Sequence, residues 1–240
     1  MKKLLGPDWL NGYAIAWTFG LFLAIGYILL RACGKVRVEG YGPAVRALRE
    51  GGVIIAANHP EGLSPFLMSA IFHRHYFVNP RFFVWNMPRE RLVPTALLRR
   101  RLRCIQVDRD STVKKVHAAA AAARVLKAGG NILIFAEGTR TFDDDNSEVV
   151  FVEMNGRRMR PVRETGLPLL ASLGGALVLP VWIDVPGVER KLHFWGSIFH
   201  LFAKRGRRMT VYFGHEPYRV EKPFDLGAEN GKLQKMILSA

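Results

Sequence analysis

Apolar runs of strand length alternate with helical segments after residue 35, and this alternation most constrains how the chain can fold. The runs at 53–57 and 131–135 are almost entirely apolar, which is typical of strands buried on both faces of a sheet. Strands that alternate with helices predict an α/β domain with a largely parallel central sheet flanked by helices.

Local signals predict where the elements begin and end. Ser64-Pro65 predicts a helix start, with Ser64 as N-cap and Pro65 at the first helical position. Asp110-Ser111-Thr112 precedes a helix that Gly129-Gly130 ends, and Asn155-Gly156 predicts a hairpin turn. The expected strands are 35–38, 53–57, 81–85, 105–107, 131–135, 176–181 and 209–213. The expected helices are 43–50, 64–72, 94–102, 113–128, 165–173 and 225–238.

An uncharged apolar segment, from Tyr13 to Leu30, precedes the domain. It is just long enough to cross a bilayer core, and its aromatic residues are of the kind that lie at membrane interfaces. The segment either spans the membrane or lies partly buried in it, and a buried helix of a soluble core is the alternative. We therefore divide the chain into a membrane-associated segment, 1–34, and an α/β domain, 35–240. The more basic C-terminal flank predicts that the domain lies on the cytoplasmic face of the inner membrane.

The formal net charge is +15, from 35 Lys and Arg against 20 Asp and Glu. A charge of this size favours an acidic partner, and the apolar segment beside it favours membrane lipids over nucleic acid. No zinc-finger spacing, aromatic RNA-binding stretch or basic coiled coil supports nucleic-acid binding. The two cysteines have no CxxC spacing and the histidines are scattered, so neither a disulfide framework nor a metal site is predicted.

Three polar clusters follow predicted strands. Asn58-His59 follows the strand at 53–57, and Asp108-Arg109 follows the strand at 105–107. Glu137-Gly138-Thr139-Arg140 follows the strand at 131–135. Sites in parallel sheets gather beyond the carboxyl ends of the strands, so we expect the three clusters to form one site.

These residue types suit chemistry on a phosphorylated alcohol. His59 is a suitable general base for a hydroxyl, and Arg109 and Arg140 are suited to hold a phosphate. Glu137 can hold an arginine or a substrate hydroxyl, and Gly138 lets the backbone approach a ligand closely. Together with the apolar segment, they suggest a hydroxyl-bearing phospholipid as substrate.

In order and spacing, the clusters resemble the conserved blocks of the glycerolipid acyltransferase family, which includes the lysophosphatidic acid (1-acylglycerol-3-phosphate) acyltransferases. Asn58-His59 resembles the start of the first block, N-H-x4-D, and residues 105–109 resemble the second. Residues 135–140 match the third block, F-P-E-G-T-R, with Ala136 in place of the proline. Residues 178–181 resemble the fourth block, and the whole resemblance covers roughly residues 35–215.

The resemblance implies transfer of a fatty acyl group from an acyl thioester to the hydroxyl of a lysophospholipid, by default lysophosphatidic acid. His59 would take the proton from that hydroxyl. The residues implied to bind the acceptor are Asn58, Arg109, Glu137, Gly138, Thr139 and Arg140. No cofactor is implied, because the acyl donor is itself a substrate, either acyl-coenzyme A or acyl-acyl carrier protein.

The first block departs from the family pattern at Ser64, where the family carries an aspartate that orients the imidazole. Serine can accept a hydrogen bond from the ring but carries no charge. Three readings remain open. Glu61 supplies the carboxylate, or the enzyme works with a His59–Ser64 pair or a carboxylate from elsewhere. In the third reading, the chain is an impaired or inactive relative that binds lipid or acyl carrier protein. A different lyso-lipid acceptor also remains open.

Overall fold

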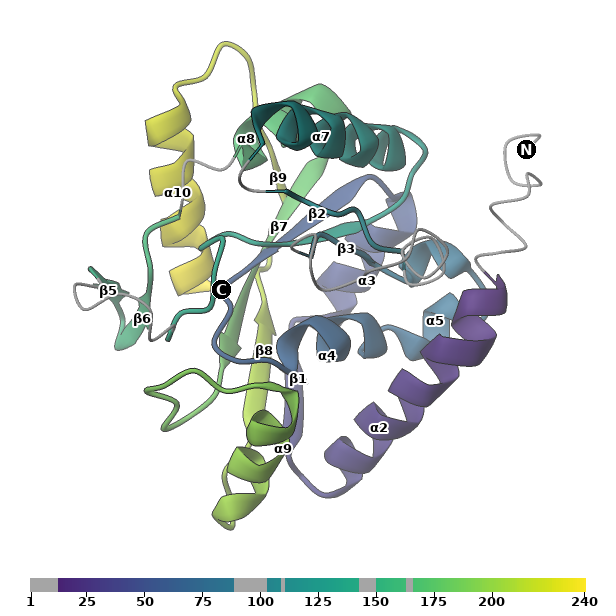
Figure 1. The fold of residues 1–240 in the computed structure, drawn as a ribbon, viewed down its shortest axis with the longest axis vertical. Coiled ribbons are helices and arrows are strands. Elements are labelled where there is room, and N and C mark those ends of the chain that lie inside the picture. Colours follow the sequence, from purple (N-terminus) through teal and green to yellow (C-terminus); the bar gives the residue numbers. More distant parts are fainter. Residues whose placement is uncertain (1–12, 89–102, 109–110, 143–149, 163–165) are drawn as a thin grey trace.

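A sheet of seven strands lies between two layers of helices (Figure 1). The structure is a computed structural model of the 240-residue chain, and it describes residues 13–88, 103–108, 111–142, 150–162 and 166–240. The strands of the sheet are β1 (Val36–Glu39), β2 (Val53–Ala57), β3 (Trp85–Asn86), β4 (Ile132–Phe135), β7 (Leu177–Asp184), β8 (Met209–Phe213) and β9 (Tyr218–Arg219). A separate hairpin pairs β5 (Val152–Met154) with β6 (Arg157–Met159).

The strand order is β1-β8-β7-β2-β4-β3, with β9 paired to β7. Strand β2 pairs in parallel with both of its neighbours, β4 and β7. Strands β1 and β8 also pair in parallel, as do β3 and β4. Antiparallel pairing occurs where β7 meets β8 and β9. The predicted α/β class with a largely parallel central sheet is confirmed.

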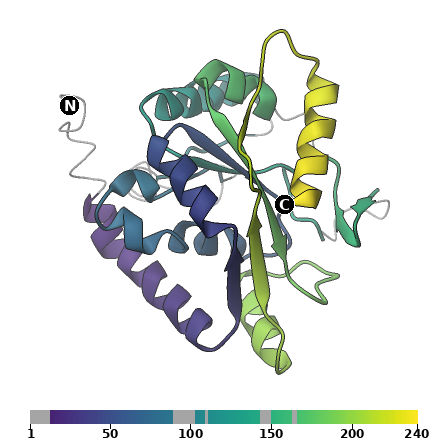
Figure 2. The same ribbon diagram turned by 180° about the vertical axis from the view of Figure 1, so that it is seen from behind.

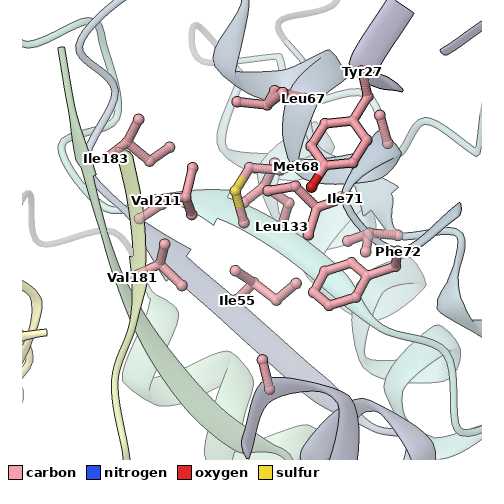
Figure 3. Close-up of a cluster of buried hydrophobic side chains, with 14 of the residues drawn as sticks. Tyr27, Ile55, Leu67, Met68, Ile71, Phe72, Leu133, Val181, Ile183 and Val211 are labelled. Carbon is pink, nitrogen blue, oxygen red and sulfur yellow. The ribbon is translucent and has the colours of Figure 1, made fainter. Parts of the chain in front are cut away.

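Strand β2 is buried on both faces. Val53, Ile55 and Ala57 belong to the hydrophobic cluster on one side of the sheet, whereas Ile54 and Ala56 belong to the cluster on the other side. Figure 3 shows Ile55 packed in the first of these clusters, among side chains of β7, β8 and the covering helices. A strand with apolar neighbours on both faces needs apolar residues at every position, and this need explains the unbroken run 53–57.

The helices divide between the two faces of the sheet (Figures 1 and 2). The elements that cover the first cluster are η2 (Ala16–Gly20), α2 (Leu21–Ala32), α3 (Tyr41–Glu50), α4 (Ser64–Ala70), α5 (His73–Tyr76), the 3₁₀ turn η3 (Pro80–Phe82) and α9 (Phe194–Ala203). Those that cover the second cluster are α7 (Thr112–Lys127), α8 (Leu167–Gly174) and α10 (Leu226–Ser239).

The predicted apolar segment forms one helix, Tyr13–Ala32, whose first half contains the π-helical η2. One side packs on the domain through Leu23 and Tyr27, and the Tyr76 hydroxyl donates a hydrogen bond to the Gly20 carbonyl. The other side exposes the large apolar side chains of Trp17, Leu21, Phe22, Ile25, Ile28 and Leu29, and Arg31 is exposed near the C-terminal end of the helix. With a mean hydropathy of 1.9, the helix is long and apolar enough to cross a membrane.

Pro180 lies inside β7, where a central strand rarely accepts proline because proline has no N–H to donate. On the side away from β2, β7 pairs with β9 up to Val178 and with β8 from Val181 onward. Pro180 therefore lies between the last residue of β7 that pairs with β9 and the first that pairs with β8. The missing N–H of proline costs least at such a break in the pairing.

Several predicted boundaries are confirmed. The strands at 53–57 and 209–213 have the predicted bounds, and Ser111 is the N-cap of α7, where its hydroxyl accepts from the Lys114 N–H at 3.4 Å. The hairpin turns at Asn155-Gly156, both with positive φ. The structure also shows α9 and β9, which the sequence pattern did not predict.

Other predictions need correction. The expected strand at 81–85 is instead the turn η3, capped by the Asn79 side chain, followed by the two-residue β3. No strand forms at 105–107; the preceding residue, Cys104, makes an isolated bridge with Asn86, and the Ile105 N–H donates to the Asn86 carbonyl at 2.9 Å. Ser64 is not the N-cap of α4, which is Leu63. The helix expected at 94–102 lies outside the described residues.

Candidate active site

The loops that follow β2 and β4 meet at the carboxyl end of the sheet. The two strands end in register, with Ala57 beside Phe135, and the Ala136 N–H donates to the Ala57 carbonyl at 2.9 Å. The His59 ring stacks on the Phe135 ring, with centroids 3.9 Å apart and planes 15° apart. Parallel pairing of two buried strands thus brings the first and third sequence clusters together, as predicted.

Glu137 ties these loops together from inside the protein, where its side chain is fully buried. One carboxylate oxygen, Oε1, accepts from the His59 backbone N–H at 2.8 Å and from the Thr141 hydroxyl at 2.6 Å. The other, Oε2, accepts from the Arg160 backbone N–H at 3.0 Å. The Thr141 N–H in turn donates to the His59 carbonyl at 2.8 Å. Glu137 therefore positions the backbone of His59, and its contact with a substrate stays a prediction.

Burial raises the pKa of Glu137 above its ordinary value, because a charged carboxylate loses its hydration inside the protein. The hydrogen bonds from Thr141, His59 and Arg160 favour the ionised form and oppose this shift, as does the positive charge of the Arg160 side chain.

Asn58 is also a positioning residue. Its amide donates to the Ile183 carbonyl at 2.9 Å and accepts from the Ile183 N–H at 2.7 Å. Through this pair of side-chain hydrogen bonds, the residue after β2 is held to the backbone of β7 two residues beyond the last β2–β7 pair, Ala57 and Val181. The amide is buried, and the predicted contact between Asn58 and an acceptor is untested.

Glu61 and Ser64 form a buried pair two and five residues after His59. The Ser64 hydroxyl donates to Glu61 Oε1, and the Leu63 N–H donates to Glu61 Oε2 at 2.5 Å. The Ser197 hydroxyl, from α9, donates to the His193 carbonyl at 2.9 Å and lies beside the same carboxyl group, where it favours the ionised form. Burial raises the pKa of Glu61, and the hydrogen bonds from Ser64 and Leu63 oppose that shift. The loop therefore holds a buried carboxyl group, that of Glu61, which accepts a hydrogen bond from Ser64, the residue that replaces the aspartate of the family.

The same loop is packed against the segment that leads into α9. A side chain at Gly62 would place its Cβ 2.7 Å from the Phe194 nitrogen and 2.8 Å from the His193 carbonyl carbon, so no larger residue fits there without movement. One turn further on, the Phe66 ring meets the Phe194 ring edge-on at 5.2 Å. The segment around Phe194 thus belongs to the site, although nothing in the sequence pattern marked it.

The remaining predicted binding residues lie in the turn after β4. Gly138 has a φ of +69°, a left-handed conformation that suits glycine, and its N–H closes the turn on the Phe135 carbonyl at 2.9 Å. Thr139 and Arg140 follow, both half-buried, and Arg140 Nη1 donates to the Leu192 carbonyl at 3.5 Å. Arg109 lies outside the described residues, while its neighbour Asp108 pairs with Lys114 at 3.0 Å.

Besides the segment around Phe194, three residues of the site were not predicted from the sequence: Thr141, Arg160 and Ser197. Thr141 directly follows the third cluster, so its place in the sequence was a usable signal. Arg160 and Ser197 carry no motif, and long-range folding alone brings them to Glu137 and Glu61. Arg160 also donates from its side chain to the Thr141 carbonyl at 2.9 Å, which fixes the turn from outside.

Comparison with protein families gives one match: the family model described as Acyltransferase matches residues 35–184. The matched range covers well over half of the chain and includes β2, β4 and β7 with the loops that follow β2 and β4. A comparison with curated proteins gives no match.

Proposed function

Because the chain belongs to the acyltransferase family, we propose that it is a membrane-associated O-acyltransferase that acylates a lysophospholipid. The acyl donor is an acyl thioester, either acyl-coenzyme A or acyl-acyl carrier protein. The acceptor is a lysophospholipid hydroxyl, with lysophosphatidic acid as the first candidate. The observation that carries the proposal is the position of His59 at the carboxyl end of β2, with its backbone held by Glu137.

In this mechanism His59 acts as general base. Its ring takes the proton of the acceptor hydroxyl as that oxygen attacks the thioester carbonyl. The C–O bond of the new ester forms, the C–S bond breaks, and the protonated His59 ring returns its proton to the departing thiolate. The hydrogen bonds of Glu137 to His59 and Thr141 fix where the ring stands relative to the reacting carbon.

Glu61 supplies the carboxylate that the family places at position 64. It lies in the same loop as His59, and Ser64 orients it through a direct hydrogen bond. A carboxyl group whose pKa is raised by burial ionises most readily when a positive charge develops beside it. Protonation of His59 during the reaction supplies that charge.

The acceptor phosphate binds at Arg140 and Arg109, and Gly138 and Thr139 line the approach. Forked guanidinium groups suit a phosphate better than single ammonium groups do. Arg140 is anchored at the Leu192 carbonyl at one nitrogen, and a guanidinium group has four more N–H donors for a ligand.

The membrane contact is made by the helix Tyr13–Ala32. We favour an interfacial position over a span, because one side of this helix packs on the α/β domain while the other exposes apolar side chains. A helix that spanned the bilayer would have to carry these domain contacts into the hydrocarbon. The basic residues that follow the helix support the cytoplasmic face of the inner membrane.

The test is acyl transfer to lysophosphatidic acid by the purified full chain, with acyl-coenzyme A and acyl-acyl carrier protein offered in parallel. We expect His59→Ala to lower kcat by about 10²- to 10⁴-fold, the usual contribution of a general base. His117→Ala, at an exposed position on α7, is the matched control and should leave the rate unchanged. Equal rates for His59→Ala and wild type would refute the proposed mechanism.

The presence of Ser64 favours one alternative, a relative that binds lipid without turnover. It predicts no transfer from either donor to any lysophospholipid, together with lipid binding that His59→Ala does not change.

A further inference from the structure

Helix α9 presents an apolar stripe to the outside of the protein. Trp195 is 67% exposed, Phe199 is 71% exposed and Phe202 is 50% exposed. Spaced four and three residues apart, these side chains lie on one face of the helix. The opposite face is anchored in the domain through Ser197 and Leu201, which are buried. Three large aromatic side chains in one stripe form a contiguous apolar surface of the kind that marks a binding face.

The length of α9 restricts what the stripe can contact. The helix has 10 residues, about half of what a bilayer crossing requires. A short helix with Trp and Phe on one face suits the boundary between headgroups and acyl chains, where such helices lie parallel to the membrane plane.

Basic side chains follow the stripe immediately. Lys204, Arg205 and Arg208 are exposed in the loop after α9. Together with Asp184 and Tyr212, this loop lines an open groove of about 440 Å³. Exposed Lys and Arg side chains are attracted to an anionic membrane surface. An apolar stripe with cations at its end is complementary to an anionic bilayer.

The end of α9 meets the end of the N-terminal helix. Lys35, three residues after α2, donates from Nζ to the Leu201 carbonyl at 2.8 Å and lies over the Phe202 ring at 5.1 Å. Figures 1 and 2 show both helices at the same end of the molecule, away from α7. The exposed apolar side of α2 and the stripe of α9 therefore belong to one end of the protein.

We propose that α9 is a second membrane-binding element, which lies flat in an anionic phospholipid bilayer with Trp195, Phe199 and Phe202 inserted. The exposed cations after it hold the lipid phosphates. This inference goes beyond the proposed function, since the contact does not require acyl transfer. It also connects the bilayer to the site, because the backbone at Phe194 packs on Gly62 and Ser197 lies beside Glu61.

A label on α9 tests the proposal in the full chain, since the N-terminal helix keeps every variant on the vesicles. Phe199→Cys is made in a Cys33→Ser background and labelled with an environment-sensitive fluorophore. Burial raises the pKa of the Cys104 thiol to about 11, so that thiol reacts slowly at pH 7. Val116→Cys, at an exposed apolar position on α7, is the matched control.

The labelled chains are placed in vesicles of phosphatidylglycerol and phosphatidylcholine. We expect a blue-shifted emission at position 199 that lipids carrying a quencher in the acyl chain extinguish, and a water-like, unquenched emission at position 116. Equal, water-like emission at both positions would overturn the proposal. A blue-shifted emission at 199 that strengthens with the protein density on the vesicles and is not quenched by the lipids would also overturn the proposal. In that case a second copy of the chain would cover the stripe.

Charge is tested by a second pair of variants. Lys204→Gln/Arg205→Gln/Arg208→Gln should reduce the quenching at 199, and vesicles of phosphatidylcholine alone should do the same. Lys115→Gln/Arg124→Gln/Lys127→Gln removes as many exposed charges from α7 and should change nothing. Identical quenching in both triple variants would remove the electrostatic part of the proposal.

Discussion

At the scale of single residues, Ser64 is part of a pair rather than a simple loss of charge. Its buried hydroxyl donates to Glu61, and that carboxyl group is itself fully buried. An aspartate at position 64 would put two carboxyl groups in contact without water, and one of them would have to stay protonated. Restoring the aspartate of the family at this position alone therefore conflicts with Glu61.

We predict that Ser64→Asp destabilises the protein by about 1–3 kcal/mol, and that Glu61→Gln/Ser64→Asp recovers most of this loss. The glutamine amide can donate to the new aspartate, so the double variant restores one carboxylate and one hydrogen bond. Urea unfolding of the wild type, Ser64→Asp, Glu61→Gln and the double variant measures the coupling energy between the two positions. If an aspartate at position 64 can serve His59, the double variant also transfers acyl groups faster than Ser64→Asp does. Additive effects of the two substitutions would contradict this account.

Glu137 supports His59 without facing solvent. We predict that Glu137→Gln lowers the free energy of unfolding by about 1–3 kcal/mol, because its NH₂ group would face a backbone N–H that now has no acceptor. The rate of acyl transfer should fall as well, since the His59 backbone loses its anchor. Glu153→Gln, at an exposed position in β5, is the control. Similar unfolding midpoints for the two variants would show that Glu137 does not hold the loop.

At the scale of elements, the site depends on contact between the loop 59–63 and the start of α9. Gly62 is the point of closest approach, although its backbone does not need a left-handed conformation. A methyl group there must displace backbone atoms of 193 and 194, which cannot rotate away as a side chain could. Packing at this glycine links the position of Glu61 to that of α9.

We predict that Gly62→Ala destabilises the protein by about 1–3 kcal/mol through overpacking and slows acyl transfer. Gly231→Ala is the matched control, because Gly231 lies in α10 with open space around its Cα. That change should stabilise the protein by about 0.5–1 kcal/mol, as alanine favours a helix. Thermal unfolding of both variants checks the opposite signs, and a stable Gly62→Ala would contradict the packing.

At the scale of the whole molecule, two buried carboxyl groups, those of Glu61 and Glu137, lie beyond the carboxyl ends of β2 and β4. Burial raises the pKa values of both. The folded protein then binds protons that the unfolded chain releases. The stabilisation from this binding is complete below the ordinary glutamate pKa of 4.5 and is lost as the pH rises through the raised value. His73 acts in the opposite direction, because burial lowers its pKa from 6.5.

Comparison of two proteins isolates the Glu61 contribution from that of the histidine. We predict that the free energy of unfolding of Glu61→Gln, minus that of the wild type, rises between pH 5 and pH 8. The wild type loses stability over this range, because its buried carboxyl group must either ionise or stay protonated, whereas the glutamine has no proton to lose. Urea unfolding at several pH values in this range measures the difference. A difference that falls with pH would mean that the folded protein lowers the pKa of Glu61.

The sequence by itself determined the α/β class, the bounds of β2 and β8, and the meeting of the His59 and Glu137 clusters. These features depend on local patterns: unbroken apolar runs, a serine cap at 111, and the rule that parallel strands end at one edge. The first and third blocks of the acyltransferase family were recognised for the same reason, because each is a short contiguous stretch.

Only the tertiary structure decided what the side chains of these clusters contact. Asn58 forms hydrogen bonds with Ile183, Glu137 accepts one from the Arg160 N–H, and Ser197 lies beside Glu61; the members of each pair are far apart in sequence. Helix α9 was missed because its apolar residues point outward as well as inward, so no alternation with polar residues marks it. Local composition fixes where strands and helices form, whereas a buried polar group finds its partner among whatever segments the packed sheet brings beside it.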